Sequence, residues 1–139
     1  RQATGEARLT MKDFAGKVLI LCSVPSLDTP TCDLETRRFN QEAAALGPDI
    51  QILTVSMDLP FAQKRWCGAA GVTAVKTLSD HREASFGLNY GVLLEGLRLL
   101  ARAVFVVDKA GVVVHAQIVP EVSSEPDYAA ALQAAKALA

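Results

Sequence analysis

The chain has 139 residues, half of them hydrophobic, which is typical of one folded domain and not of a disordered segment. Lys and Arg, 14 in total, nearly balance 15 Asp and Glu, and the net charge of −1 gives no reason to expect a nucleic acid or an anionic membrane as a partner. No apolar run approaches the roughly 18 residues that a membrane span needs. No secretion signal stands at the start, so we expect a cytoplasmic protein; because the chain begins at Arg1 and not at Met, a removed signal and a periplasmic location stay open.

Apolar runs and helix-ending residues alternate along the chain. Residues 1–16 are polar and mixed, which indicates a loop or a short edge strand. Strands are predicted over 17–24, 50–57, 75–78, 99–107 and 112–119, the last two joined by a tight turn at 108–111. The first predicted helix begins at Pro30 and ends at Gly47-Pro48, and the second begins at a cap at Asp58 and ends at Gly68. A short third helix is predicted from a capping box at Asp80 and Glu83 to about Gly87. The last helix is predicted from Ser124 and Asp127 to Ala139, with Pro126 in its first turn.

The order of these elements predicts the fold class. Strands that alternate with helices favour a parallel sheet with crossover helices, and the final hairpin adds an antiparallel edge. This is the outline of a thioredoxin-like α/β domain, and no linker or repeat divides residues 1–139. The loops that follow parallel strands meet at one edge of such a sheet, so we expect a site where the first two strands end.

Cys32 is the strongest candidate for chemistry. Thr29 is a good N-cap and Pro30 fits the first helical position, which places Cys32 in the first turn of a helix. Free N–H groups and the helix dipole favour an anion there, so the spacing predicts a lowered thiol pKa and a reactive thiolate. Cys32 also begins the apolar stripe of this helix, and we expect it to be only partly exposed. A buried, unreactive thiol is the alternative.

Cys67 is predicted at the far end of the second helix, beside Trp66. The negative end of the helix dipole favours a neutral thiol there, in contrast to Cys32. About 13 Å of helix axis, at ~1.5 Å per residue, separates Cys67 from the sheet edge where Cys32 lies. A disulfide needs Cα atoms within about 7 Å, so a bond between the two would require local unwinding. Alternatively, Cys67 is a packed residue at a helix end.

Arg102 lies within an apolar strand, where an unpaired guanidinium is costly. It is therefore expected to face an anion, either the Cys32 thiolate or a substrate oxygen; alternatively it begins the strand and pairs with a surface carboxylate. The Thr29 hydroxyl can orient a small oxygen-containing substrate, and Pro25 can shield the thiolate from water. Such a pocket suits a peroxide, whose leaving oxygen takes on negative charge. The thiolate becomes a sulfenic acid, which a second thiol condenses to a disulfide.

Several separated segments resemble the peroxiredoxins, and more narrowly the bacterial thiol peroxidases. The segments are residues 25–32 (PSLDTPTC, matching P-x-x-x-[T/S]-x-x-C), 58–68 (DLPFAQKRWCG), 100–104 (LARAV), Glu121 and 125–128 (EPDY). The resemblance runs from about Phe14 to the C-terminus. It implies a thioredoxin-like fold, a homodimer, no metal or organic cofactor, hydrogen peroxide and organic hydroperoxides as substrates, and thioredoxin as the reductant.

The resemblance also implies a role for each candidate residue. Cys32 is the peroxidatic cysteine, and Cys67 is the resolving cysteine, joined to it within one chain. Thr29 and Arg102 activate the thiolate and bind peroxide, while Pro25 shields it. Four apolar residues supply either a mouth for bulky peroxides or core packing: Leu27, Leu59, Phe61 and Trp66.

The sequence departs from the family pattern in three places. The N-terminal hairpin and further strand of the family are not visible ahead of the matching region, and residues 93–99 lack the expected Asp-Gly-Pro turn. Cys22, on the first strand, is not a family position and is expected to be buried and inert. His81 and His115 lie far from each other and from the cysteines in sequence, so a zinc site has little support.

Two other functions remain open at this stage. One is a thiol–disulfide oxidoreductase of thioredoxin type, although no C-x-x-C motif occurs in the chain. The other is an inactive thioredoxin-fold binding module with an ordinary Cys32 thiol. Consumption of peroxide distinguishes a peroxidase from both of these functions.

Overall fold

The computed structural model describes residues 11–43, 46–94, 96–120 and 124–138. Its main sheet has five strands in the order β3-β2-β1-β6-β7. The strands are β1 Val18–Ser23, β2 Ile50–Ser56, β3 Val75–Ser79, β6 Ala103–Val107 and β7 Val113–Ile118. The first three are parallel, and β6 and β7 add to β1 in antiparallel fashion. The predicted thioredoxin-like mixed sheet with an antiparallel edge is confirmed.

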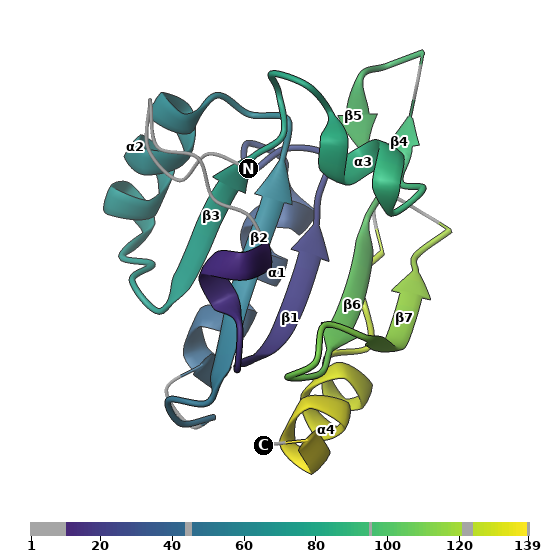
Figure 1. Cartoon of the computed structure of the whole chain (residues 1–139). Coiled ribbons are helices and arrows are strands. Elements are labelled where there is room, and N and C mark those ends of the chain that lie inside the picture. The colour runs from purple at the N-terminus through teal and green to yellow at the C-terminus, as the bar shows by residue number, and fades with distance from the viewer. Residues whose placement is uncertain (1–10, 44–45, 95, 121–123, 139) are drawn as a thin grey trace.

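Helices cover both faces of this sheet. They are η1 Met11–Phe14, α1 Pro30–Ala43, α2 Pro60–Ala70, α3 Ser85–Asn89 and α4 Tyr128–Leu138. In Figure 1, η1 and α3 lie in front of the sheet, α1 lies behind it, and α2 lies beside β3. A second, two-stranded sheet, which the sequence did not predict, pairs β4 (Leu93–Leu94) with β5 (Leu99–Leu100). Within the described residues, no helix is long and apolar enough to cross a membrane.

Two apolar layers pack on the sheet because successive strand residues point to opposite faces. Along β1, Val18, Ile20 and Cys22 face the core shared with α1 and α4. Leu19 and Leu21 face the other core, against which α3 packs. All six residues of β1 are buried, as expected for a central strand covered on both faces. The expectation that Cys22 is buried is confirmed, since it is 0% exposed.

The predicted strand over 99–107 is divided in the structure. Leu99 and Leu100 form β5 in the small sheet, and β6 begins only at Ala103. Between them, the Ala101 carbonyl accepts a hydrogen bond from Ser23 Oγ (2.7 Å) and the Ala101 N–H donates to the Val92 carbonyl (2.7 Å). Apolar character alone did not reveal the break, because Ser23, one of the two partners of Ala101, lies 78 residues earlier in the sequence.

The cap of α2 differs from the prediction at both ends. Leu59, and not Asp58 as predicted, is the N-cap, and its apolar side chain makes no capping bond. The Asp58 carboxylate binds the loop before α1 instead. Gly68 lies inside the helix, which continues to Ala70. Gly71 ends it in the left-handed conformation (φ 69°), a geometry that favours glycine.

The third and fourth helices are also capped differently from the prediction. Asp80 accepts from the N–H groups of Phe86 and Gly87 and not from that of Glu83, so the expected capping box is wrong. Asp127 caps α4 through Ala130 N–H (3.0 Å). Pro126 therefore precedes α4 and does not lie in its first turn. The expected N-terminal loop falls on η1 from residue 11 onward, and residues 1–10 lie outside the described part.

Candidate active site

The loop between β1 and α1 is held by one carboxylate. Asp58 accepts hydrogen bonds from Ser26 Oγ (2.7 Å), Leu27 N–H (2.8 Å) and Ser56 Oγ (2.8 Å). Val24 N–H adds a bond to the Val55 carbonyl (3.0 Å). These contacts attach the loop to the end of β2, so the start of α1 has a defined position at the carboxyl edge of the parallel strands, where the site was expected.

The start of α1 places Cys32 in the first helical turn. Thr29 precedes the helix, and its carbonyl accepts the first helical bond from Asp33 N–H (3.0 Å). Its hydroxyl does not act in the side-chain capping role that the sequence predicted; instead it donates to the Ser26 carbonyl (2.8 Å). With its proton used in that bond, the Thr29 oxygen presents lone pairs that can accept a hydrogen bond from a substrate.

The Cys32 side chain is fully enclosed. It is 0% exposed and packs with Val24, Leu27 and Trp66. The sequence predicted partial exposure, and the difference arises because Leu27 of the preceding loop and Trp66 of α2 both cover the first turn of α1. Pro25 is buried next to this cluster in the chain, so the surroundings of the sulfur are apolar on this side.

Arg102 supplies the positive charge at this site. Its guanidinium is 1% exposed, and Nη2 lies 3.2 Å from Cys32 Sγ. Burial alone would lower the pKa of Arg102, but the hydrogen bond and charge of Cys32, together with those of Glu35, raise it overall. The guanidinium therefore stays charged beside the sulfur.

Glu35 is the residue that the sequence reasoning missed. It is 0% exposed, and its Oε1 accepts from Arg102 Nη1 at 3.2 Å. Burial raises the pKa of Glu35 to about 7, although the charge and hydrogen bond of Arg102 oppose the rise. The signal for it was present: Glu35, Thr36 and Phe39 follow Cys32 at i+3, i+4 and i+7, so Glu35 falls on the buried stripe and needs a cation.

Cys67 lies apart from this group in the reduced protein. It is half-buried in α2, with Sγ 3.6 Å from Thr77 Oγ1, and packs against the core between the sheet and α1. Cys22, Cys32 and Cys67 are all free thiols. The structure therefore brings Arg102 to Cys32 but keeps Cys67 beside β3.

A polar contact fastens α2 to the first turns of α1. Trp66 Nε1 donates to Asp33 Oδ1 (2.9 Å), and Arg37 Nε donates to Asp33 Oδ2 (3.0 Å). The Arg37 guanidinium lies over the Trp66 ring at 5.9 Å and its Nη1 donates to the Ala70 carbonyl (3.4 Å). We call Asp33, Arg37 and Trp66 the helix clasp.

The four apolar residues proposed for the mouth of the site divide into two kinds. Leu27 is 3% exposed and Trp66 is half-buried, so both belong to the packing around Cys32. Leu59 and Phe61, at the start of α2, are 49% and 73% exposed.

Among the described residues, no group of three or more His, Cys, Asp or Glu side chains is placed to hold a metal ion.

A thioredoxin-like sheet, with a cysteine in the first turn of a helix buried against an arginine, defines a class of thiol-dependent redox proteins. Residues 1–132 match the Redoxin family. The chain is 55% identical over 129 residues to the thiol peroxidase of Bacillus subtilis (strain 168), covering 93% of this chain and 77% of the relative. It is 58% identical over 122 residues to the thiol peroxidase of Oceanobacillus iheyensis, covering 88% and 74%.

Solved structures agree with this assignment. The peroxiredoxin-like protein from Aquifex aeolicus superposes with a TM-score of 0.84 at 42% identity, covering 89% of this chain and 73% of that one. AhpC of Mycobacterium tuberculosis, at 24% identity and a TM-score of 0.81 over 94% and 74% of the two chains, shares the fold. The chain belongs to the redoxin family, among the thiol peroxidases.

Proposed function

We propose that Cys32 attacks the peroxide and that Cys67 resolves the product within the same chain. The observation that carries this assignment is the 3.2 Å contact between Arg102 Nη2 and Cys32 Sγ inside an enclosed, largely apolar site. A fixed cation beside a sulfur at a helix N-terminus lowers the free energy of the thiolate, which is the nucleophile. Residues 1–139 act as one domain in this proposal.

The first step transfers one oxygen atom from the peroxide to the sulfur. The Cys32 thiolate attacks one oxygen of R–O–O–H, the O–O bond breaks, and a sulfenic acid forms while the other oxygen leaves as an alkoxide that takes up a proton. Arg102 stabilises the negative charge that develops on the leaving oxygen. The free lone pairs of Thr29 Oγ1 accept the peroxide hydrogen bond, and Pro25 keeps water from the sulfur.

Small movements admit the substrate, because Cys32 has no exposed surface. Leu27 and Trp66 cover the sulfur, so these two side chains must separate from it. The exposed Leu59 and Phe61 support an apolar approach to the site, which favours organic hydroperoxides with bulky groups beside hydrogen peroxide.

The second step requires α2 to move. Cys67 attacks the Cys32 sulfenic acid, a disulfide forms and water leaves. Because Cys67 lies against Thr77 and the helix clasp holds α2 on α1, the clasp and the last turns of α2 must open first. Trp66 is the single tryptophan of the chain, so its fluorescence reports this opening.

Thioredoxin is the proposed reductant of the disulfide, and a homodimer is the proposed assembly. We place the reaction in the cytoplasm, where thioredoxin keeps thiols reduced. The apolar Leu59 and Phe61 support a contact surface beside the site for either partner.

Peroxide consumption in the presence of thioredoxin and its reductase tests the proposal. Cys32→Ser should abolish turnover. Cys67→Ser should still consume one equivalent of peroxide but should neither turn over with thioredoxin nor show the Trp66 fluorescence change that accompanies disulfide formation. Cys22→Ala, a change at a buried thiol outside the site, is the matched control and should keep the parent activity. Turnover by Cys32→Ser at the parent rate would refute the assignment, and insulin reduction without peroxide consumption would favour an oxidoreductase.

A further inference from the structure

Two acidic groups share one guanidinium in this site. Cys32 and Glu35 lie one helical turn apart on α1, and both are 0% exposed. Arg102 Nη2 contacts the sulfur and Nη1 contacts Glu35 Oε1, each at 3.2 Å. The peroxidase reaction described above uses the sulfur and the guanidinium but assigns no role to the carboxyl group.

The surroundings of Glu35 contain little else to balance its charge. Its Oε2 is buried and has no hydrogen-bond partner among the described residues. Arg102 is the cation that lowers its pKa, whereas Glu125 is a second acid that raises it. On the β1 side lies Cys22, whose thiol pKa is raised by burial and then by the charge of Glu35.

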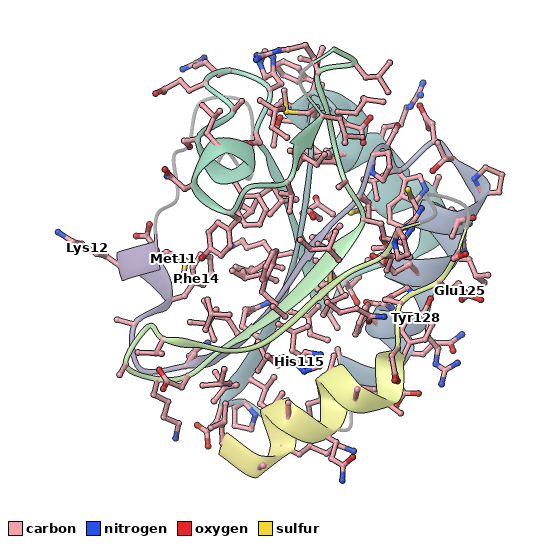
Figure 2. All side chains as sticks on the ribbon, turned by 90° about the vertical axis from the view of Figure 1, so that its right-hand side faces the viewer. Met11, Lys12, Phe14, His115, Glu125 and Tyr128 are labelled. Carbon is pink, nitrogen blue, oxygen red and sulfur yellow. The ribbon has the colours of Figure 1, made fainter. Side chains whose placement is uncertain are left out.

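Among the described residues, further titratable groups near Glu35 lie on α1, at the start of α4 and in the segment just before α4. Tyr128 donates to Glu125 Oε1 (2.7 Å), and Figure 2 shows these two side chains next to each other. The Arg38 guanidinium lies over the Tyr128 ring at 5.0 Å, and it pairs with the carboxylate of Glu42. Tyr128 has its pKa raised by burial and by Glu125, so it stays neutral and adds no negative charge near Glu35.

We propose that Glu35 is a positioning residue that shares the Arg102 guanidinium with Cys32, so that a negative charge on either group opposes a negative charge on the other. Two anions that compete for one buried cation titrate as a pair. Protonation of Glu35 removes one negative charge from the guanidinium that also contacts the Cys32 sulfur, and ionisation of Glu35 restores that charge. The inference rests on the proposed role of Cys32 as the nucleophile.

Coupling of this kind makes the reactive sulfur sensitive to pH near neutrality. Because burial raises the pKa of Glu35 to about 7, the carboxyl group changes charge near neutral pH. Below that range the neutral carboxyl supports the thiolate, and above it the carboxylate opposes the thiolate. The pH–rate profile of Cys32 is then broader than that of a single group.

The rate of Cys32 alkylation by iodoacetamide between pH 4.5 and 9 tests the proposal, with the Cys32 peptide quantified by mass spectrometry. Glu35→Gln keeps the side-chain shape and an oxygen acceptor for Arg102 but carries no charge. Its profile should narrow and shift to lower pH by about one unit, which corresponds to about tenfold more alkylation below the inflection. Glu42→Gln, on the same helix, should overlay the parent. An unchanged or upward-shifted inflection in Glu35→Gln would overturn the proposal.

A reciprocal measurement keeps the proposal testable if Glu35→Gln does not fold. Linkage requires that Cys32 affect Glu35 as strongly as Glu35 affects Cys32. Titration of the Glu35 carboxyl by NMR should therefore give a lower midpoint in Cys32→Ser than in the parent, and equal midpoints would refute the sharing. Neither measurement uses peroxide, so failure of the peroxidase assignment and failure of this inference remain distinguishable.

Discussion

The buried carboxyl group of Glu35 has a calculable effect on stability. Its pKa rises from an ordinary value near 4.5 to about 7 in the folded protein, a difference of about 2.5. The folded state therefore binds this proton more tightly than the unfolded chain does. The resulting stabilisation is complete below about pH 4.5 and is lost as the pH rises to about 7. At about 1.4 kcal/mol for each pKa unit, the loss amounts to about 3 kcal/mol.

The perturbation that isolates this effect is Glu35→Gln. Urea unfolding of the reduced protein at pH 4.5, 5.5, 6.5 and 7.5 gives the free energy of unfolding of parent and variant. The difference, variant minus parent, should increase by about 3 kcal/mol over this range, because only the parent loses the contribution of the neutral carboxyl. Glu42→Gln, at a partly exposed position on the same helix, should give a nearly constant difference. A constant difference for Glu35→Gln as well would refute the reasoning.

Three further changes probe the site and the fold. Arg102→Lys should lower kcat/KM for peroxide about 100-fold, because a single ammonium cannot contact both Cys32 and a peroxide oxygen as the planar guanidinium does in the proposed mechanism; a stopped-flow peroxide assay measures it. Asp58→Ala should lower the free energy of unfolding by about 3 kcal/mol in urea, since three hydrogen bonds lose their acceptor. Gly87→Ala should lower it by about 1–3 kcal/mol, because the new Cβ would lie 2.8 Å from Leu100 Cδ2.

The two stability changes each have a matched control. Asp28→Ala alters an exposed carboxylate in the loop that Asp58 holds and should leave stability nearly unchanged. Gly68→Ala adds a Cβ with no atom within 4 Å inside α2, and it should stabilise the protein by about 0.5–1 kcal/mol. Equal losses for Gly68→Ala and Gly87→Ala would contradict the packing argument, and full activity of Arg102→Lys would contradict the role of the fork-shaped guanidinium.

The fold could be predicted where hydrophobic runs and chain order carry the information. The run Val18–Ser23 and its neighbours gave the strands, and the alternation with helices gave the mixed sheet. The predictions were wrong where a residue distant in the sequence determines the local structure. The break between β5 and β6 involves the bond from Ser23 Oγ to the Ala101 carbonyl, which joins residues 78 positions apart. Similarly, Asp58 binds the loop before α1, although local sequence rules favour it as a helix cap.

The sequence predicted Arg102 together with Cys32 in the candidate site, but it did not predict the second acid, Glu35. The apolar surroundings of Arg102 predicted an anion against it, and Cys32 Sγ lies at that position. The sequence did not predict Glu35 in the site, because its partner Arg102 lies 67 residues further along the chain. The enclosure of Cys32 was also not predicted, since it depends on Trp66, which reaches the first turn of α1 from another helix.

The placement of Cys67 beside Thr77 has a consequence under heavy oxidant load. In the mechanism proposed above, the oxidised sulfur either condenses with Cys67 or meets a second peroxide and becomes an irreversible sulfinic acid. The first fate is intramolecular and waits for the contact between Trp66 and Asp33 to break, whereas the second accelerates in proportion to peroxide concentration. A firmer attachment between α1 and α2 therefore lowers the dose at which the enzyme is lost, and a looser one raises it.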